Sequence, residues 1–338
     1  MTPTQEPKGG TRPDPRRWSV MHSLSQEDSA AVAALRSFVA PMKGKFEGTA
    51  GRSSFNDFME RVPAPEGVIF EAATVGGISC WWARPTQVPR RAAIIHVHGG
   101  WFNWGTAQSA RHFAGQIARS AGANVLIPDY RLAPEHPFPA AVRDLEACYR
   151  GLVDEGTTTI AISGDSAGGN LALVLLSTAS AEASRGAVVP VGAVVFSPIT
   201  DLTLTGESFD TRAETELYFT KSQARELVRT YLGATDPKNP LASPLYGDLS
   251  GLPPVRIHVG DDEVLLDDSR RYVERAVVAG VDARLEIWMG MPHGFVANVD
   301  AFTAATQALK ASGVFLSQQL GKSGRTSQLG KHGAEGGT

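Results

Sequence analysis

The chain has 338 residues, of which 42% are hydrophobic and 20% charged, and its formal net charge is −3. This composition is that of a globular protein with one large α/β domain plus an insertion, or with two domains. The charge excludes a basic nucleic-acid-binding surface, and no apolar run reaches the roughly 20 residues that cross a bilayer. Residues 1–18 lack the apolar core of a secretory signal. Cys80 and Cys148 lie in apolar surroundings and are expected to be reduced thiols, so the predicted compartment is the cytoplasm.

Apolar periodicity divides the chain into alternating strands and helices. Residues 1–25 and 321–338 lack periodic apolar positions and are expected to be disordered. In chain order we expect helices at about 25–45 and 55–61, strands at 68–72, 78–83 and 92–97, a helix at 107–120, a strand at 124–127, a helix at 139–154, strands at 158–162 and 191–196, a helix at 222–232, a strand at 255–259, a helix at 269–279, a strand at 284–288 and a helix at 304–318. Such alternation implies a mostly parallel sheet with helices on both faces.

Residues 203–247 interrupt this alternation, because they contain a helix and Pro-rich turns but no strand pattern. An insertion between two core strands is a frequent location for a cap over an active site. We therefore expect a helical cap made of residues 26–65 and 203–247. The catalytic core is expected to comprise residues 66–202 and 248–320. A merely decorative loop is the alternative interpretation of the insertion.

A sharp turn rich in small residues follows the strand predicted at 158–162. Residues 163–170 read Ser-Gly-Asp-Ser-Ala-Gly-Gly-Asn, and a helix pattern comes directly after them. A strand, a Gly-x-Ser-x-Gly turn and a helix form a nucleophile elbow, in which Ser166 would be presented at the end of the sheet. A helix start packed closely through glycines is the alternative, since glycine is frequent in this chain. The interpretation therefore depends on partners in the order serine, acid, histidine.

A histidine and a group of carboxylates occur in that order after Ser166. His293 lies in a loop that follows the last predicted strand, where the base of a triad is expected. The strand at 255–259 leads into a loop at 260–268 that contains five carboxylates, one of which should accept the proton of the histidine Nδ1. The last two, Asp267 and Asp268, suit capping of the next helix. Chemistry alone leaves three candidates for the triad acid: Asp261, Asp262 and Glu263.

A glycine-containing loop supplies candidates for the oxyanion hole that acyl transfer needs. Residues 98–102 read His-Gly-Gly-Trp-Phe and follow the strand at 92–97, an HGGG-type sequence whose glycines let N–H groups turn into the site. A phosphate-binding loop is the alternative, but the Lys-Ser/Thr pair of a P-loop is missing. The candidate donors are the backbone N–H groups of Gly99, Gly100, Trp101 and Ala167.

Together these motifs resemble the hormone-sensitive-lipase-like, or bacterial family IV, carboxylesterases of the α/β-hydrolase fold, in the branch with Gly-Asp-Ser-Ala-Gly at the elbow. The likeness covers about residues 65–318 and rests on four stretches: 98–101, 129–141, 164–169, and 251–254 with the acid loop and His293. It implies a catalytic triad of Ser166, Glu263 and His293, with Glu263 where most relatives have Asp and Asp262 as the second choice. The same resemblance gives Asp267 a structural role and implies neither a metal nor a cofactor.

Trp101 stands where the family usually has a third glycine. A tryptophan does not readily adopt a positive φ, and its ring should either line the pocket or pack beneath the cap. The expected activity is hydrolysis of small to medium, soluble esters through an acyl-enzyme. Lactone or amide hydrolysis with the same triad is the alternative, and a non-catalytic ligand-binding protein, which usually lacks the histidine, is less favoured. Because relatives often form dimers, a homodimer is the oligomeric state that the resemblance suggests.

Overall fold

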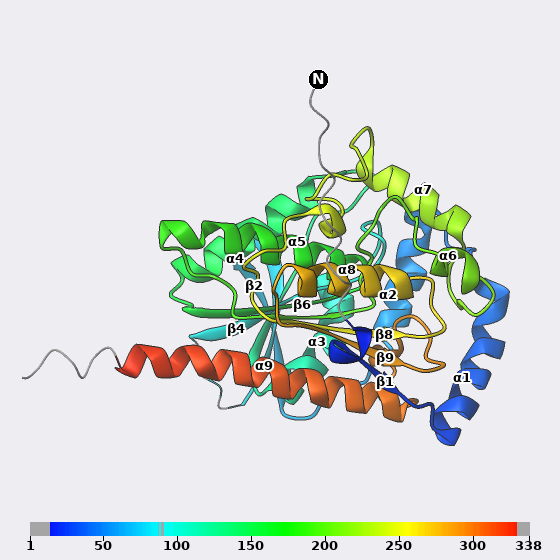
Figure 1. Ribbon diagram of the computed structural model, residues 1–338, viewed down its shortest axis with the longest axis horizontal. Coiled ribbons are helices and arrows are strands. Elements are labelled where there is room, and N and C mark those ends of the chain that lie inside the picture. Colours follow the sequence, from blue (N-terminus) through cyan, green and yellow to red (C-terminus); the bar gives the residue numbers. More distant parts are fainter. Residues whose placement is uncertain (1–13, 87, 89–90, 330–338) are drawn as a thin grey trace, which may run out of the picture.

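A nine-stranded sheet forms the centre of the computed structural model, which describes residues 14–86, 88 and 91–329 (Figure 1). The strands are β1 (Ser19–His22), β2 (Val68–Val75), β3 (Ile78–Pro85), β4 (Ala92–Val97), β5 (Asn124–Pro128), β6 (Thr159–Asp165), β7 (Ala193–Phe196), β8 (Val255–Gly260) and β9 (Ala283–Trp288). Their order across the sheet is β1-β9-β8-β7-β6-β4-β5-β3-β2. Neighbours from β1 to β5 pair in parallel, whereas β3 is antiparallel to both β5 and β2. The predicted, mostly parallel sheet is confirmed.

The central strands are short runs of small and β-branched apolar residues. Each residue of β5 and β7 is buried, as is nearly every residue of β4 and β6. Continuous apolar runs of this kind are typical of parallel strands that helices cover on both faces. The carboxyl ends of these strands meet at one edge of the sheet, where α/β folds place their ligands.

Helices cover both faces of the sheet (Figure 1). One face carries α3 (Ala107–Ala121) and α9 (Thr303–Leu329), and the other carries α4 (Ala140–Asp154), α5 (Ala167–Ala181) and α8 (Leu266–Val278). Each layer of helices encloses its own apolar core against the sheet. Of the helices that the structure describes, none combines the length and apolar character that a membrane crossing requires.

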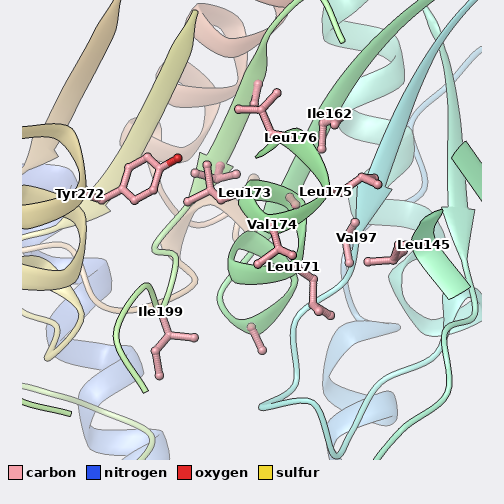
Figure 2. Close-up of a cluster of buried hydrophobic side chains, with 14 of the residues drawn as sticks. Val97, Leu145, Ile162, Leu171, Leu173, Val174, Leu175, Leu176, Ile199 and Tyr272 are labelled. Atoms are coloured by element: carbon pink, nitrogen blue, oxygen red, sulfur yellow. The ribbon is translucent and has the colours of Figure 1, made fainter. Parts of the chain in front are cut away.

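Helix α5 forms the centre of one of the two cores. Its leucines and Val174 point toward β4, β6, α4 and α8, with Leu145 and Tyr272 among their neighbours (Figure 2). A helix buried on nearly every side is expected to be apolar all round rather than amphipathic, as residues 171–176 are. Full burial of each large side chain contributes about 1.5–3 kcal/mol, so this core holds the amino terminus of α5 firmly at the end of β6.

The two cysteines lie in the same core. Cys80 of β3 and Cys148 of α4 are buried, and their sulfur atoms are 3.8 Å apart without a disulfide. The contact with Cys80, together with burial, raises the pKa of the Cys148 thiol. The prediction of packed, reduced thiols is therefore confirmed, although residues 68 positions apart in sequence prove to be neighbours in space.

Four further helices gather at the carboxyl end of the strands (Figure 1). They are α1 (Gln26–Val39), α2 (Gly51–Met59), α6 (Ser208–Thr211) and α7 (Lys221–Leu232). We call residues 26–59, which include α1 and α2, and residues 203–247 the helical cover. Its two parts bind each other directly, because the N–H of Gly44 donates to the carbonyl of Tyr218 and Lys43 Nζ donates to the carbonyl of Ala213.

The two ends of the chain differ from the expectation of disorder. Residues 15–17 form a 3₁₀ turn, and β1 pairs in parallel with β9, from Ser19 opposite Leu285 to His22 opposite Trp288. An exposed strand edge offers a row of unpaired N–H and C=O groups, and the short segment satisfies those of β9. Helix α9 likewise continues to Leu329. The remaining residues of the two predicted disordered segments, 1–13 and 330–338, lie outside the described residues.

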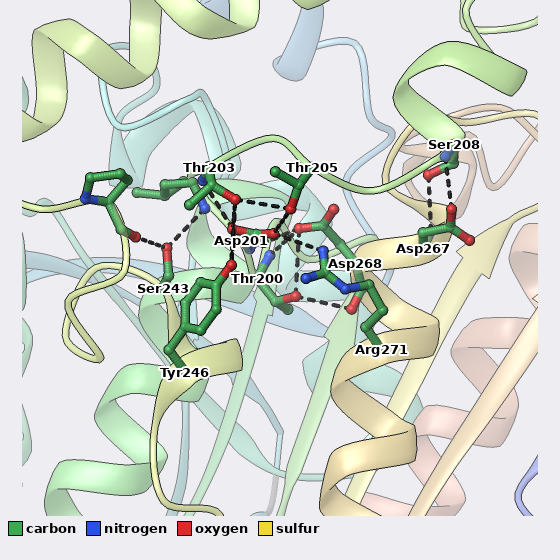
Figure 3. Close-up of polar contacts among 12 residues, drawn as sticks. Thr200, Asp201, Thr203, Thr205, Ser208, Ser243, Tyr246, Asp267, Asp268 and Arg271 are labelled. Atoms are coloured by element: carbon green, nitrogen blue, oxygen red, sulfur yellow. Dashed lines mark hydrogen bonds and ion pairs between the residues drawn. The ribbon is translucent and has the colours of Figure 1, made fainter. Parts of the chain in front are cut away.

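A buried polar network fixes the chain where it leaves β7 for the helical cover (Figure 3). Asp268 Oδ1 accepts hydrogen bonds from the N–H groups of Thr200 and Asp201, at 2.7 and 2.8 Å. Asp201 Oδ2 in turn accepts from Arg271, at 2.7 Å. Burial raises the pKa of Asp268 to about 7. Asp268 was expected to cap the helix after the acid loop, but its carboxylate instead ties α8 to the residues that follow β7.

Candidate active site

The turn between β6 and α5 presents Ser166 in a strained backbone conformation. Its φ and ψ are 55° and −120°, and its N–H donates to the carbonyl of Phe196 at 2.8 Å. A Cβ on Gly164 would lie 2.4 Å from the carbonyl oxygen of Gly168, and one on Gly168 would lie 2.1 Å from that of Val97. Glycine is therefore required at both positions. Non-glycine residues with positive φ cost about 1–3 kcal/mol and cluster at functional sites.

Hydrogen-bonding distances connect Ser166, His293 and Glu263 in a line. His293 Nε2 lies 3.1 Å from Ser166 Oγ, and His293 Nδ1 lies 2.7 Å from Glu263 Oε2. The second carboxylate oxygen, Oε1, accepts from Ser197 Oγ at 2.7 Å and from the N–H of Gly260 at 2.6 Å. Because both oxygens are engaged and the side chain is fully buried, the carboxylate has one orientation toward the imidazole.

The other two candidate acids face away from His293. Asp261 Oδ1 pairs with Arg212 at 3.2 Å, and Asp262 Oδ2 pairs with Arg36 at 3.1 Å. Both arginines belong to the helical cover. Among the three carboxylates that chemistry left open, the structure brings only Glu263 to the imidazole.

The carboxylates around His293 favour its protonated form. Burial by itself would lower the pKa of His293, but the charge of Glu263 and its hydrogen bond act in the opposite direction, together with the charges of Glu216 and Asp165. The net effect raises the pKa of His293 above its usual 6.5. A histidine in this setting is neutral only toward the alkaline side of that value, and its imidazolium is stabilised once it has accepted a proton.

The loop after β4 lies beside Ser166 and turns sharply. Gly100 has φ of 119°, and a Cβ there would lie 2.3 Å from the carbonyl oxygen of Trp104. The N–H of Gly99 donates to Asp165 Oδ1 at 3.2 Å, which separates it from the other three candidate donors. In the part of the chain that the structure describes, the N–H groups of Gly100, Trp101 and Ala167 have no acceptor. These three are free to bind an oxyanion.

Trp101 adopts the conformation that its side chain was expected to disfavour. Its φ is 53°, so the expectation from residue type is wrong at this position. Its carbonyl accepts from the Asn103 side chain at 2.6 Å, and its ring meets Phe219 edge to face at 4.9 Å. These contacts hold the backbone in place. The ring both packs beneath the helical cover and lines the cavity over Ser166, so the two interpretations of Trp101 hold together.

His98 organises the start of this loop without facing Ser166. Its Nδ1 lies 2.8 Å from the carbonyl of Gly99, and its ring stacks on Tyr130 at 4.3 Å. The phenol of Tyr130 donates to the carbonyl of His98 at 2.8 Å. Burial lowers the pKa of His98, which keeps the imidazole neutral inside the core.

A cavity of about 370 Å³ leads from the surface to Ser166 and His293. The core and the helical cover both contribute to its walls. Most of the lining side chains are apolar, and many are aromatic: Phe38, Phe55, Phe58, Trp104, Tyr218 and Phe219. The shape and lining suit an uncharged, largely apolar ligand whose reacting atom is presented to the serine.

Two polar residues of the site carried no recognisable sequence signal. Ser197 follows β7 with φ of 47° and binds Glu263. A position at the carboxyl end of a strand next to β8 was the available hint. Glu216 belongs to the insertion, where no motif marks it, yet it is fully buried beside the acid loop.

Comparison with known proteins identifies relatives over most of the chain. Residues 94–297 match the family with the alpha/beta hydrolase fold. An acetyl-hydrolase of Streptomyces hygroscopicus is 38% identical over 254 residues, which cover 75% of this chain and 84% of that protein. An esterase of Acinetobacter venetianus is 37% identical over 228 residues, covering 66% of this chain and 74% of that protein.

Solved structures agree with these relatives. The structure of an esterase from the bacterial hormone-sensitive lipase family matches with a TM-score of 0.80 at 37% identity, covering 88% of this chain and 99% of the other. An esterase/lipase from an uncultured bacterium matches with a TM-score of 0.79 at 37% identity, covering 88% of this chain and 100% of the other. The expected fold and the family resemblance are thus confirmed. The chain belongs to the α/β hydrolases, within the bacterial hormone-sensitive-lipase family of esterases, and is a carboxylic ester hydrolase.

Proposed function

We propose that this enzyme is a serine carboxylesterase that hydrolyses small to medium carboxylic esters through an acyl-enzyme intermediate. The observation that carries the proposal is the hydrogen-bonded line from Ser166 Oγ through His293 to Glu263 at the base of an apolar cavity. Nucleophile, base and orienting acid within hydrogen-bonding distance are the signature of covalent catalysis by serine.

Acylation begins when His293 Nε2 takes the Ser166 proton as Oγ attacks the ester carbonyl. The carbonyl oxygen becomes an oxyanion, and the N–H groups of Gly100 and Ala167, with that of Trp101, stabilise it. Glu263 holds the Nδ1 proton and stabilises the imidazolium. Collapse of the tetrahedral intermediate breaks the bond to the alkoxy group, which leaves as the alcohol with the proton from His293.

Deacylation repeats these steps with water. His293 accepts a proton from a water molecule as its oxygen attacks the acyl carbonyl, and the same N–H groups stabilise the second oxyanion. The bond to Ser166 Oγ then breaks, and His293 returns the proton to the serine. The products are the carboxylic acid and the alcohol.

The helical cover sets substrate preference in this proposal, acting as a cap. It supplies Phe38, Phe55 and Phe58 to the cavity wall, so esters with apolar acyl or alcohol groups are favoured over charged ones. The acetyl-hydrolase among the relatives supports a short acyl group as one such substrate.

The direct test is Ser166→Ala assayed on p-nitrophenyl butyrate. Loss of the nucleophile should lower kcat by about 10⁴-fold or more. A fluorophosphonate probe should label the wild-type enzyme at Ser166 and fail to label the variant, and the melting temperature shows that the variant is folded. Turnover retained by folded Ser166→Ala would refute the assignment.

A substrate panel separates ester hydrolysis from the alternatives. Acetate, butyrate and decanoate esters of p-nitrophenol should be hydrolysed faster than p-nitroacetanilide and a γ-lactone, because p-nitrophenoxide is a better leaving group than the anilide nitrogen or the ring alkoxide of the lactone. A larger kcat/KM for the anilide or the lactone would redirect the proposal to amide or lactone hydrolysis by the same triad.

A further inference from the structure

The acid loop, which in the structure is residues 261–265 between β8 and α8, is bound closely by the helical cover. Arg36 pairs with Asp262, and Arg212 pairs with Asp261. These two ion pairs engage adjacent residues of the same loop, and their arginines lie more than 170 residues apart in the sequence. The helical cover is thus fastened to the loop that carries the proposed triad acid, rather than resting on the core as a separate lid.

Glu216 makes the most buried of these contacts. Only 1% of its surface is exposed. Its Oε1 accepts from the N–H of Tyr218 at 3.0 Å, and its Oε2 accepts from the N–H of Val264 at 3.2 Å. Val264 directly follows Glu263, so the carboxylate of Glu216 is attached to the main chain beside the proposed triad acid.

No cation compensates this buried carboxylate among the described residues: its hydrogen bonds come from main-chain N–H groups. A buried charge without a counterion is costly. The negative charge of Glu216 favours the protonated form of His293. The same segment also contacts that histidine, because the Phe219 and His293 rings pack edge to face with their centroids 5.2 Å apart. Residues 217–219 in turn line the cavity.

We propose that Glu216 is a positioning residue of the hydrolase: it holds the cavity wall at 217–219 against the acid loop and stabilises the His293 imidazolium that forms during each step. The inference rests on the proposed function, because it assumes that His293 accepts a proton during turnover. It gives the insertion a part in the chemistry as well as in substrate binding.

The charged groups that face this histidine come from three elements. Glu263 follows β8, Asp165 ends β6, and Glu216 comes from the helical cover. Glu216 itself faces His293 and Glu263: burial raises the pKa of its carboxyl and the charge of Glu263 adds to this rise, whereas the charge of His293 opposes it. The phenol of Tyr218, whose pKa is raised by burial and then by Glu216, remains neutral throughout.

The charge of Glu216 is tested by the pH dependence of Glu216→Gln. Glutamine keeps an acceptor for the N–H of Tyr218 and removes the negative charge, so the imidazolium is stabilised less. The acid limb of the kcat/KM profile on p-nitrophenyl butyrate should move to lower pH by about half a unit or more. The value of kcat at the plateau should fall about tenfold, with a smaller change in KM.

Glu214→Gln is the matched control. It makes the same substitution two residues away on the same segment, where the side chain is exposed and solvent screens its charge. Its acid limb and kcat should equal those of the wild-type enzyme. An equal shift in both variants would trace the effect to net charge and overturn the role of Glu216.

A second variant, Glu216→Asp, tests position separately from charge. It keeps the charge but is one methylene shorter, so contact with the N–H of Val264 is lost. Its acid limb should stay near that of the wild type while kcat falls, and this variant carries the test if Glu216→Gln does not fold. Wild-type kcat in Glu216→Asp, or a wild-type acid limb in folded Glu216→Gln, would overturn the inference. Failure of the proposed function is distinguishable, because it appears as turnover by Ser166→Ala.

Discussion

The elbow and the acid loop contribute to the same site but are held in different ways. The turn from Gly164 to Gly168 packs against the backbone of Val97 and His98, within the core. The acid loop at 261–265 instead binds arginines and a carboxylate of the helical cover. The proposed nucleophile, Ser166, is therefore positioned by the sheet, whereas the proposed acid, Glu263, is positioned jointly by the sheet and the cover.

Because of this difference, we expect the acid loop to be more adaptable to sequence change than the elbow. Two glycines whose Cβ atoms would collide with backbone oxygens leave the elbow no freedom. The acid loop is bound by side chains at its surface, and side-chain contacts can change as the helical cover changes. A change in the cover is thus expected to reach His293, through Glu263 and through the Phe219 contact, and to leave the turn around Ser166 unaffected.

The largest effect that separates these two halves is expected at the proposed triad acid. Glu263→Ala removes the acceptor of the His293 Nδ1 proton and should lower kcat by about 10²–10⁴-fold, as loss of the orienting acid does in serine hydrolases. Steady-state kinetics on p-nitrophenyl butyrate measure the loss. The N–H donors around Ser166 are untouched, so a residual rate above that of water should remain.

Asp262→Ala is the control within the same loop. It deletes a neighbouring carboxylate that pairs with Arg36 and should lower kcat by less than about tenfold. If Asp262→Ala were the more damaging of the two, Asp262 would have to be reassigned as the acid that serves His293.

The same contrast between the elbow and the acid loop decides which site residues could be predicted from the sequence. The elbow is a contiguous motif whose spacing specifies its own geometry, so Ser166 and its glycines could be predicted directly. Three adjacent carboxylates in one loop are distinguished by where their side chains point. Arg36 and Arg212 draw two of them, Asp262 and Asp261, toward the helical cover. The sequence alone does not show which of them the cover engages, and family resemblance was needed to favour Glu263.

Other features depended on pairings between distant parts of the chain. β1 lacks a strong apolar pattern and forms because β9 offers a free edge. The positive φ of Trp101 contradicts its residue type and is maintained by contacts with Asn103 and Phe219. Local propensity is outweighed in both cases by tertiary contacts, whereas the alternation of strands and helices in the core follows local patterning and was predictable.

A second, smaller effect is expected where α8 is tied to the chain leaving β7. The folded-state pKa of Asp268 is about 7, well above the usual 3.8. The folded protein therefore binds the carboxyl proton of Asp268 more tightly than the unfolded chain does. The stabilisation of the folded state by this bound proton is fully present below about pH 4 and is lost as the pH rises through 7. Asp268→Asn cannot ionise and can keep Oδ1 as the acceptor for the two N–H groups. From pH 5 to pH 8 its unfolding free energy should gain roughly 2–3 kcal/mol relative to the wild type.

Urea unfolding at the two pH values measures this change. Asp201 and Arg271 are the charged groups that face Asp268, and neither is altered. A difference between variant and wild type that is the same at pH 5 and pH 8 would mean that Asp268 is already ionised in the folded protein at pH 5. The connection between α8 and the residues that follow β7 would then rely on an ion rather than on a neutral acid.

The smallest expected effect tests the fastening of the cover itself. Arg212→Gln breaks the ion pair with Asp261. Both side chains are partly buried, so the pair should stabilise the folded protein by about 0.5–1 kcal/mol. The acid loop should become more mobile, and kcat/KM should fall about two- to fivefold. Arg229→Gln is the matched control, because Arg229 belongs to the same insertion but pairs with Glu226 of its own helix. Equal kinetics in the two variants would mean that the Arg212–Asp261 pair does not help to position Glu263, and the hold of the cover on the acid loop would then rest on Arg36 and Glu216.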